Sequence, residues 1–194
     1  MNTLELFPTH VYAWDWNGDT GIILEQVKDI FKDEEPKDVM QSHPNILGEI
    51  DVLSNFINEC LGEIKSQCQL QCEGLKVTTS WINKYQSSAK LQWHRHPMSA
   101  FSGVIFLNDC GILSLEDPVD FRNYESTIPF SNTQKVFDLQ SIPGRVIIFP
   151  WWMKHTAESN IDGERWSLAF NSMPYGTINS NYKPALSSAI LEVK

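Results

Sequence analysis

The chain has 194 residues, of which 42% are hydrophobic and 20% are charged. This length favours a single domain that buries a core without disulfide bonds, and the composition excludes a disordered chain. Fifteen Lys and Arg against 24 Asp and Glu give a net charge of −9. This negative net charge makes binding to nucleic-acid backbones or to anionic membranes an unfavoured function for the protein. The N-terminus has neither the basic region nor the apolar run of a signal peptide, so we expect a soluble cytoplasmic protein.

Two helices are predicted in the first third of the chain, after a short strand at 11–14. Asp19 or Thr20 can cap a helix that runs to about residue 33. Residues 37–45 are polar and loop-like. A longer helix is predicted at about 47–69, because its apolar residues lie on one stripe. These are Ile50, Leu53, Ile57, Cys60, Leu61, Ile64 and Cys68.

From residue 75 onward the hydrophobic pattern changes to that of short strands. Strands are predicted at 75–85, 101–107, 112–116, 136–139, 145–149 and 165–171, and a short extended segment at 92–96. A long polar insert at 118–143 could act as a lid or specificity loop. Helices followed by strands predict an antiparallel sheet or a double-sheet barrel backed by helices. We therefore expect one domain over 1–194, with N-terminal strand and supporting helices at 1–74, the core at 75–175 and a C-terminal tail at 176–194.

Three of the five histidines form a candidate metal site. His94 and His96 are two residues apart, so on an extended segment both side chains project to the same face. His155 follows about sixty residues later, just after an apolar strand. Such a set can occupy one face of a coordination sphere and leave the other positions to substrate and O2, as in facial-triad iron sites. The alternative is two surface histidines near a turn and an unrelated third.

A second candidate feature lies ten residues after His155, where Arg165 and Ser167 share one face of a predicted strand. The planar guanidinium can bind a carboxylate through two parallel hydrogen bonds, and a hydroxyl two residues on can add a third. The alternative is a solvated cation on an edge strand. The pairing with Ser167 and the distance from His155 favour a pocket for a dicarboxylate beside a metal.

Residues 78–172 resemble the 2-oxoglutarate/iron(II)-dependent oxygenases. In that superfamily a His-x-Asp/Glu pair and a distal His bind iron, and an Arg-x-Ser about ten residues later holds the C5 carboxylate of 2-oxoglutarate. Tyr85 lies nine residues before His94, a spacing similar to that in prolyl 4-hydroxylase-like members. The segments 106–118 and 143–150 also look like the family's next hairpin and distal-His strand. The chain is most similar to a branch found in bacteria and in phages of aquatic bacteria, which often begins with a Leu-Phe-Pro-Thr-like segment, as at 6–9.

This resemblance implies a mainly β fold, a double-stranded β-helix (jelly roll, cupin-like) with the N-terminal helices packed on the larger sheet. It implies an iron(II)- and 2-oxoglutarate-dependent dioxygenase that hydroxylates a peptidyl or small-molecule group, while 2-oxoglutarate is decarboxylated to succinate. The expected partners are 2-oxoglutarate, O2 and an unidentified substrate, with homo-oligomerisation left open. A phage-encoded protein would act in the host cytoplasm.

The resemblance also assigns roles to individual residues. His94, His96 and His155 would be the catalytic metal ligands. Arg165, Ser167 and Tyr85 would bind 2-oxoglutarate, and Asn83 would either bind the cosubstrate or bridge strands. Three tryptophans that flank the ligands in sequence could form an aromatic wall for the substrate or pack in the core: Trp93, Trp151 and Trp152. Core packing is favoured for Trp152, because tryptophan is usually buried.

One departure from the superfamily pattern is that His96 stands where the resemblance expects Asp or Glu. The site could be an all-His triad, His96 could swing away, or the site could be inactive. We favour the all-His triad, because imidazole suits iron and the same-face geometry is retained. The rival functions are a catalytically inactive binding module of the same fold and an all-His cupin-type metalloenzyme that does not use 2-oxoglutarate. A nucleic-acid demethylase is disfavoured by the net charge of −9.

Overall fold

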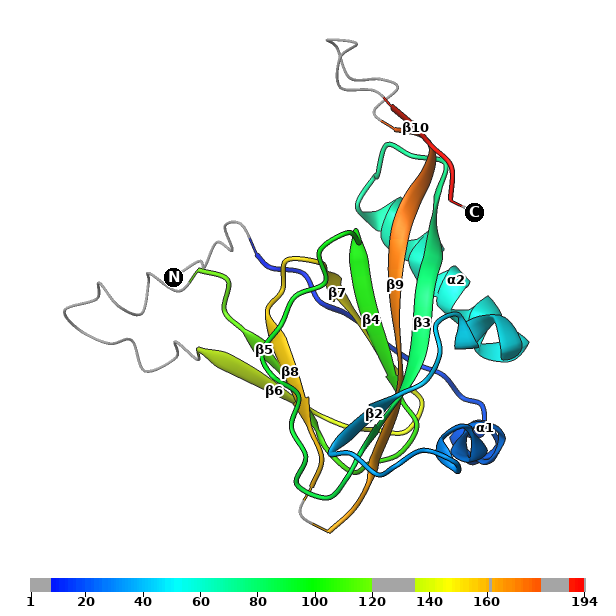
Figure 1. Cartoon of the computed structure of the whole chain (residues 1–194). Coiled ribbons are helices and arrows are strands. Elements are labelled where there is room, and N and C mark those ends of the chain that lie inside the picture. Colours follow the sequence, from blue (N-terminus) through cyan, green and yellow to red (C-terminus); the bar gives the residue numbers. More distant parts are fainter. Residues whose placement is uncertain (1–7, 120–134, 161, 179–188, 194) are drawn as a thin grey trace, which may run out of the picture.

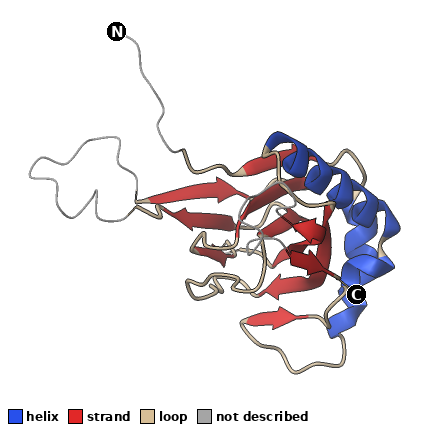
Figure 2. Ribbon diagram, turned by 90° about the horizontal axis from the view of Figure 1, so that it is seen from above, coloured by secondary structure: helices blue, strands red, loops and turns tan. Residues whose placement is uncertain are grey.

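The computed structural model describes residues 8–119, 135–160, 162–178 and 189–193. Two antiparallel sheets face each other, and the helices cover the outer face of the larger one (Figure 1, Figure 2). Most of the predicted lid insert, half of the N-terminal 6–9 segment and much of the predicted tail lie outside the described residues. None of the helices in the described ranges is long and apolar enough to cross a membrane.

The first helix is shorter than predicted. It follows strand β1 (Tyr12–Asp15) and comprises α1 (Thr20–Val27) and a 3-10 turn, η1 (Lys28–Phe31). Asp19 is the N-cap: its carboxylate accepts a hydrogen bond of 2.8 Å from the backbone N–H of Gly21. The predicted start is therefore confirmed, while the last turn tightens into 3-10 geometry, as helix ends often do.

The second predicted helix divides into a 3-10 turn, η2 (Ile46–Glu49), and helix α2 (Asp51–Gln67). Ile50 separates them, because its backbone (φ −129°, ψ 75°) is not helical. The apolar stripe is confirmed through most of its length, since its helical members from Leu53 to Ile64 are buried. Cys68, at the end of the helix, is exposed instead.

The larger sheet has the strand order β1-β7-β4-β9-β3-β2, with β10 paired to β9. Its remaining strands are β2 (Val39–Gln41), β3 (Gly74–Tyr85), β4 (Phe101–Phe106), β7 (Arg145–Pro150), β9 (Arg165–Ile178) and β10 (Ala189–Leu191). Strand β2 corrects the expectation of a loop at 37–45: it is a three-residue edge strand, too short to show alternation. Strand β9 continues past the predicted end at 171 because it pairs with β3 as far as Tyr175 and with β10 beyond it.

The smaller sheet has the order β6-β5-β8, formed by β5 (Ile112–Glu116), β6 (Val136–Gln140) and β8 (His155–Glu158). Strand β8 was not predicted. The expected extended segment at 92–96 forms no regular strand, but His94 makes an isolated antiparallel bridge to His155. This bridge brings the long β3–β4 connection onto the end of β8.

The two faces of the larger sheet have different cores. The outward side chains of β9, Trp166, Leu168 and Phe170, pack with the helices in one apolar cluster. A second cluster fills the space between the sheets and includes Phe106 and Phe149. Because side chains alternate along a strand, the inward positions of β9 are Arg165 and Ser167, which therefore lie on the side of the second cluster. The polar residues of interest are thus inside the β-sandwich.

Candidate metal and cosubstrate site

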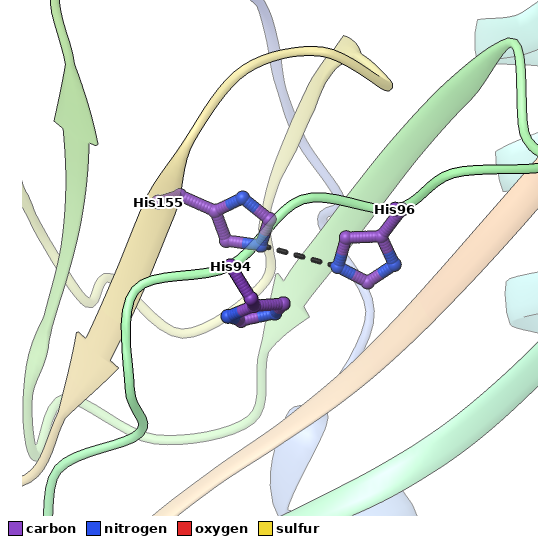
Figure 3. Close-up of side chains that lie close together, drawn as sticks. All are labelled: His94, His96 and His155. Carbon is purple, nitrogen blue, oxygen red and sulfur yellow. Dashed lines mark hydrogen bonds between the residues drawn. The ribbon is translucent and has the colours of Figure 1, made fainter.

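The three predicted histidines come together at one end of the space between the sheets. His155 begins β8, and His94 and His96 project from the β3–β4 connection (Figure 3). One nitrogen from each ring lies within 4.8 Å of the others. The Nε2 atoms of His96 and His155 are 3.2 Å apart. His96 therefore points into the cluster, and the possibility that it swings away does not occur in this structure.

Backbone carbonyls fix the ring orientation of two of these histidines. The Nδ1 atom of His94 lies 2.9 Å from the carbonyl oxygen of Gln92, and Nδ1 of His155 lies 3.0 Å from that of Met153. A carbonyl only accepts hydrogen bonds, so both Nδ1 atoms carry a proton and Nε2 is the atom that each ring can offer to a metal. This is the arrangement expected of histidine metal ligands.

Burial also keeps the ligand candidates in the unprotonated form. It lowers the pKa of His155 to about 3; the hydrogen bond to the Met153 carbonyl opposes this shift, and neighbouring His94 and His96 add to it. Burial likewise lowers the pKa of His96 to about 4, helped by His94 and opposed by a hydrogen bond to the side chain of Asn171. Neutral imidazole is the form that binds a metal, so these two rings are ready to do so at neutral pH.

The cluster fits a divalent transition metal. Two imidazole nitrogens that bind one ion at about 2.1 Å lie roughly 3.0–3.4 Å apart, and the His96–His155 separation of 3.2 Å falls in that range. Within the described part of the chain, the group comprises these three histidines and no carboxylate. The donor set is therefore three imidazoles.

Arg165 is almost fully buried, with 1% of its surface exposed, and two of its nitrogens have no hydrogen-bond partner in the described part of the chain. These are Nε and Nη1, and the buried hydroxyl of Ser167 is also without a partner among the described residues. The guanidinium carbon lies 4.8 Å from the ring centre of Tyr85. Burial lowers the pKa of Arg165 and Tyr85 opposes that shift, but a guanidinium remains charged in proteins. A buried cation with open donors calls for an anionic ligand, because unpaired buried polar groups are costly.

Asn83 lies on the same inward face of β3 as Tyr85 and is 5% exposed. Its Oδ1 accepts hydrogen bonds from Trp81 Nε1 (3.0 Å) and Gln41 Nε2 (2.8 Å). An indole N–H can only donate, so the acceptor beside Trp81 must be the amide oxygen. The Asn83 amide therefore bridges β2 and β3 through its oxygen, while its NH2 group is left for other partners.

All seven predicted site residues line one cavity. The register of the strands sets their order, because Tyr85 is opposite Arg165 and Asn83 is opposite Ser167.

Among the other residues that line this cavity, two that contact the predicted site residues were missed by sequence reasoning. Trp81 stacks on His96, with ring centres 5.9 Å apart and planes 17° from parallel, and Gln41 comes from the unpredicted strand β2. The alternation of Trp81 with Asn83 and Tyr85 was an available signal for the first; nothing marked the second.

The three tryptophans near the ligands in sequence do not line the cavity. Trp151 is 44% exposed, and Trp152 is half-buried against the core between the sheets. The Trp93 ring lies 5.6 Å from the ammonium of Lys154. The expectation of core packing is therefore supported for Trp152, and none of the three forms a wall of this cavity.

Comparison with solved structures defines the class of fold. A prolyl-4-hydroxylase from Pseudomonas putida is similar at 13% identity and a TM-score of 0.60, covering 87% of this chain and 94% of that one. HygX from Streptomyces hygroscopicus, solved with nickel and 2-oxoglutarate, is similar at 10% identity and a TM-score of 0.58 (86% and 83%). The collagen prolyl hydroxylase of Paramecium Bursaria Chlorella virus-1 gives 12% identity and a TM-score of 0.57 (84% and 94%). The predicted double-stranded β-helix is thereby confirmed.

Residues 79–171 match the family model described as "Putative 2OG-Fe(II) oxygenase". This segment, just under half of the chain, is that of a 2-oxoglutarate/iron(II)-dependent oxygenase. A search of curated proteins gives no match.

Proposed function

We propose that the protein is an iron(II)- and 2-oxoglutarate-dependent dioxygenase that hydroxylates a peptidyl or small-molecule substrate. The observation that carries this proposal is the placement of open, buried donors in the same cavity as three imidazoles. Arg165 and Ser167 supply the donors. A ligand that suits both ends must join a metal-binding group to a distal carboxylate, and 2-oxoglutarate has this structure. A cytoplasmic location, expected from the sequence, is part of the same proposal.

Each part of the cavity has a separate task. His94, His96 and His155 hold iron through their Nε2 atoms, and the Nδ1–H hydrogen bonds of His94 and His155 prevent those two rings from turning. Arg165 and Ser167 bind the distal carboxylate. With Fe(II) and 2-oxoglutarate bound, the centre supplies the oxidation in which O2 yields a hydroxylated product, succinate and CO2.

Tyr85 and Asn83 orient the cosubstrate. The Tyr85 ring packs against the guanidinium and so fixes the plane in which Arg165 presents its donors. Asn83 is held by its oxygen, and we assign its NH2 group as a donor to 2-oxoglutarate beside Ser167, its neighbour across the strands. Asn83 thus both bridges strands and contacts the ligand.

The all-His donor set has a consequence for metal binding. Three neutral imidazoles leave the centre with one more positive charge than two imidazoles and a carboxylate would. Ligand charge tunes both affinity and potential, so we expect weaker retention of Fe(II) than at a site that contains a carboxylate.

The test is 2-oxoglutarate binding to the Fe(II)-loaded protein under anaerobic conditions, followed by succinate release when O2 is admitted. Arg165→Ala removes a charge-assisted contact worth about 1.5–3 kcal/mol, so we expect affinity for 2-oxoglutarate to fall by roughly 10- to 150-fold. Arg145→Ala is the matched control, because Arg145 pairs with Asp15 on the surface and should leave affinity unchanged.

Each rival function predicts a different result. A metalloenzyme that does not use 2-oxoglutarate would bind metal but give no saturable 2-oxoglutarate binding. An inactive binding module would bind 2-oxoglutarate without releasing succinate on addition of O2. Equal affinities for the wild type and the Arg165 variant would contradict the assignment of the carboxylate site.

A further inference from the structure

His96 differs from the other two histidines in how its ring is held. The rings of His94 and His155 each donate Nδ1–H to the backbone carbonyl two residues before them. The equivalent carbonyl for His96 is that of His94; it accepts the backbone N–H of His155 at 3.0 Å, and among the described residues no hydrogen bond joins it to the His96 ring. A ring that presents Nε2 to the metal needs a partner for Nδ1, so His96 must find one elsewhere.

A polar row across three strands lies at this end of the sandwich. Asn171 on β9 is opposite Thr79 on β3 and Ser102 on β4. Its Nδ2 donates to Thr79 Oγ1 at 3.0 Å, and its Oδ1 accepts from Ser102 Oγ at 2.8 Å. The Asn171 amide is therefore fixed from both sides, as is common for side chains that support a metal ligand.

Hydrogen bonds connect this polar row to the backbone carbonyl of His96. Ser99 Oγ donates to the carbonyl of His96 at 3.0 Å and lies 3.1 Å from Ser102 Oγ. Ser99 and Ser102 are both buried. The Asn171 side chain is also close enough to the His96 ring to raise its pKa, which is the effect of an oxygen that accepts a ring N–H. An amide oxygen has two lone pairs, so Oδ1 can serve both Ser102 and the ring.

We propose that Asn171 is the positioning residue for His96: its amide oxygen accepts Nδ1–H of His96 and so directs Nε2 to the metal. It does for the third ligand what backbone carbonyls do for the other two. Trp81, stacked on the His96 ring, supports the same orientation. This inference rests on the proposed function in that it takes the three histidines as metal ligands.

The test is a double-mutant cycle in which the affinity for Co(II) is measured. The visible absorption of protein-bound Co(II) reports binding, and no 2-oxoglutarate is present. Asn171→Leu keeps the size but removes the acceptor, so we expect Co(II) affinity to fall about 10- to 100-fold, the usual effect of losing a partner of a ligand. His96→Ala should weaken binding further. On the His96→Ala background, Asn171→Leu should change nothing more, because Asn171 acts through His96.

Two variants distinguish this role from a purely structural one. Asn171→Asp keeps the acceptor and should retain Co(II) affinity within a few-fold. Asn108→Leu is the matched control, because Asn108 also joins chain segments by two hydrogen bonds, to Trp166 N and Glu164 O, away from the histidines. It should reduce thermal stability but leave Co(II) affinity unchanged. If Asn171→Leu does not fold, Ser102→Ala takes its place. This variant removes the hydroxyl that fixes the orientation of the Asn171 amide, so we again expect weaker Co(II) binding.

Each outcome decides the inference. Unchanged Co(II) affinity in Asn171→Leu overturns it, as does an equal loss with and without His96. Failure of the wild type to bind Co(II) overturns the metal site itself and the inference with it. Loss of 2-oxoglutarate binding with normal Co(II) behaviour would count against the proposed function alone.

Discussion

Gly111 lies directly against the aliphatic part of Arg165. A Cβ atom at this position would meet Arg165 Cδ at 2.4 Å and the backbone oxygen of Glu158 at 2.3 Å, and the residue has φ +155°. We predict that Gly111→Ala displaces the arginine and lowers affinity for 2-oxoglutarate, as well as costing about 1–3 kcal/mol of unfolding free energy for the strained backbone. Calorimetric titration and denaturant unfolding measure the two effects.

The control for this prediction is Gly62→Ala in helix α2. A Cβ atom there meets nothing within 4 Å. Since alanine is favoured over glycine in a helix, this variant should match or exceed wild-type stability and bind 2-oxoglutarate normally. A Gly111 variant with normal affinity would mean that Arg165 tolerates the displacement.

The buried imidazoles make the metal-free protein sensitive to acid. The pKa values of His96 and His155 are about 4 and about 3, against an ordinary value of 6.5. At pH values between about 4 and 6.5 the unfolded chain binds more protons than the folded one. The free energy of unfolding is therefore highest above about pH 6.5 and falls as the pH drops towards 4. The total loss should be on the order of a few kcal/mol.

Urea unfolding in the presence of a chelator, from pH 7 to 4, measures this loss. His96→Gln removes one of the two groups and should flatten the dependence. Identical pH profiles for the variant and the wild type would contradict the link to His96.

Site residues could be predicted from the sequence where they form an uncommon pattern of reactive or charged side chains. Two histidines two apart, a distant third and an Arg-x-Ser pair are rare enough to be noticed. Gln41 and Asn171 carry no such mark, because an amide gains its role only from the partner that the sheet register places opposite it. Asn171 meets Thr79 and Ser102 through pairing between strands distant in sequence.

Helix α2 is the element that most firmly covers the outer face of the larger sheet. Leu53, Ile57, Leu61 and Ile64 are fully buried against it. We predict that Ile57→Ala lowers the unfolding free energy by about 2–5 kcal/mol, because it leaves a cavity in the packed core. Val52→Ala, on the same helix but with Val52 57% exposed, should change it by less than about 1 kcal/mol. Denaturant unfolding of both variants is the measurement, and equal losses would contradict the assigned face of the helix.

Elements were predictable where they are long and show a clear period. The helices and the strands β3, β4, β5 and β7 fall in this class. Strands β2 and β8 have three and four residues and were missed, since a run this short shows no alternation. Strand β8 exists because β5 pairs with it and because the backbone of His155 bonds to that of His94. These are long-range contacts that local sequence does not encode.

In the whole molecule, the proposed ligands would connect two parts that otherwise meet through apolar packing. His155 belongs to the smaller sheet, and Arg165 and Ser167 belong to β9 of the larger one. A metal at the histidines and a 2-oxoglutarate molecule that reaches Arg165 would therefore link the sheets across the cavity. Ligands that bind only the folded state stabilise it, by about 2.7 kcal/mol at a concentration of 100 Kd.

This geometry predicts an order of protection in amide hydrogen exchange. Metal alone should slow exchange in β8 and in the β3–β4 connection, which carry its ligands. Adding 2-oxoglutarate should extend the protection to the beginning of β9, because the cosubstrate then connects both sheets. In Arg165→Ala the first step should remain and the second should be lost. If 2-oxoglutarate protected β9 equally in that variant, the cosubstrate would not bridge the sheets through Arg165, and its distal carboxylate would have to be bound by another group.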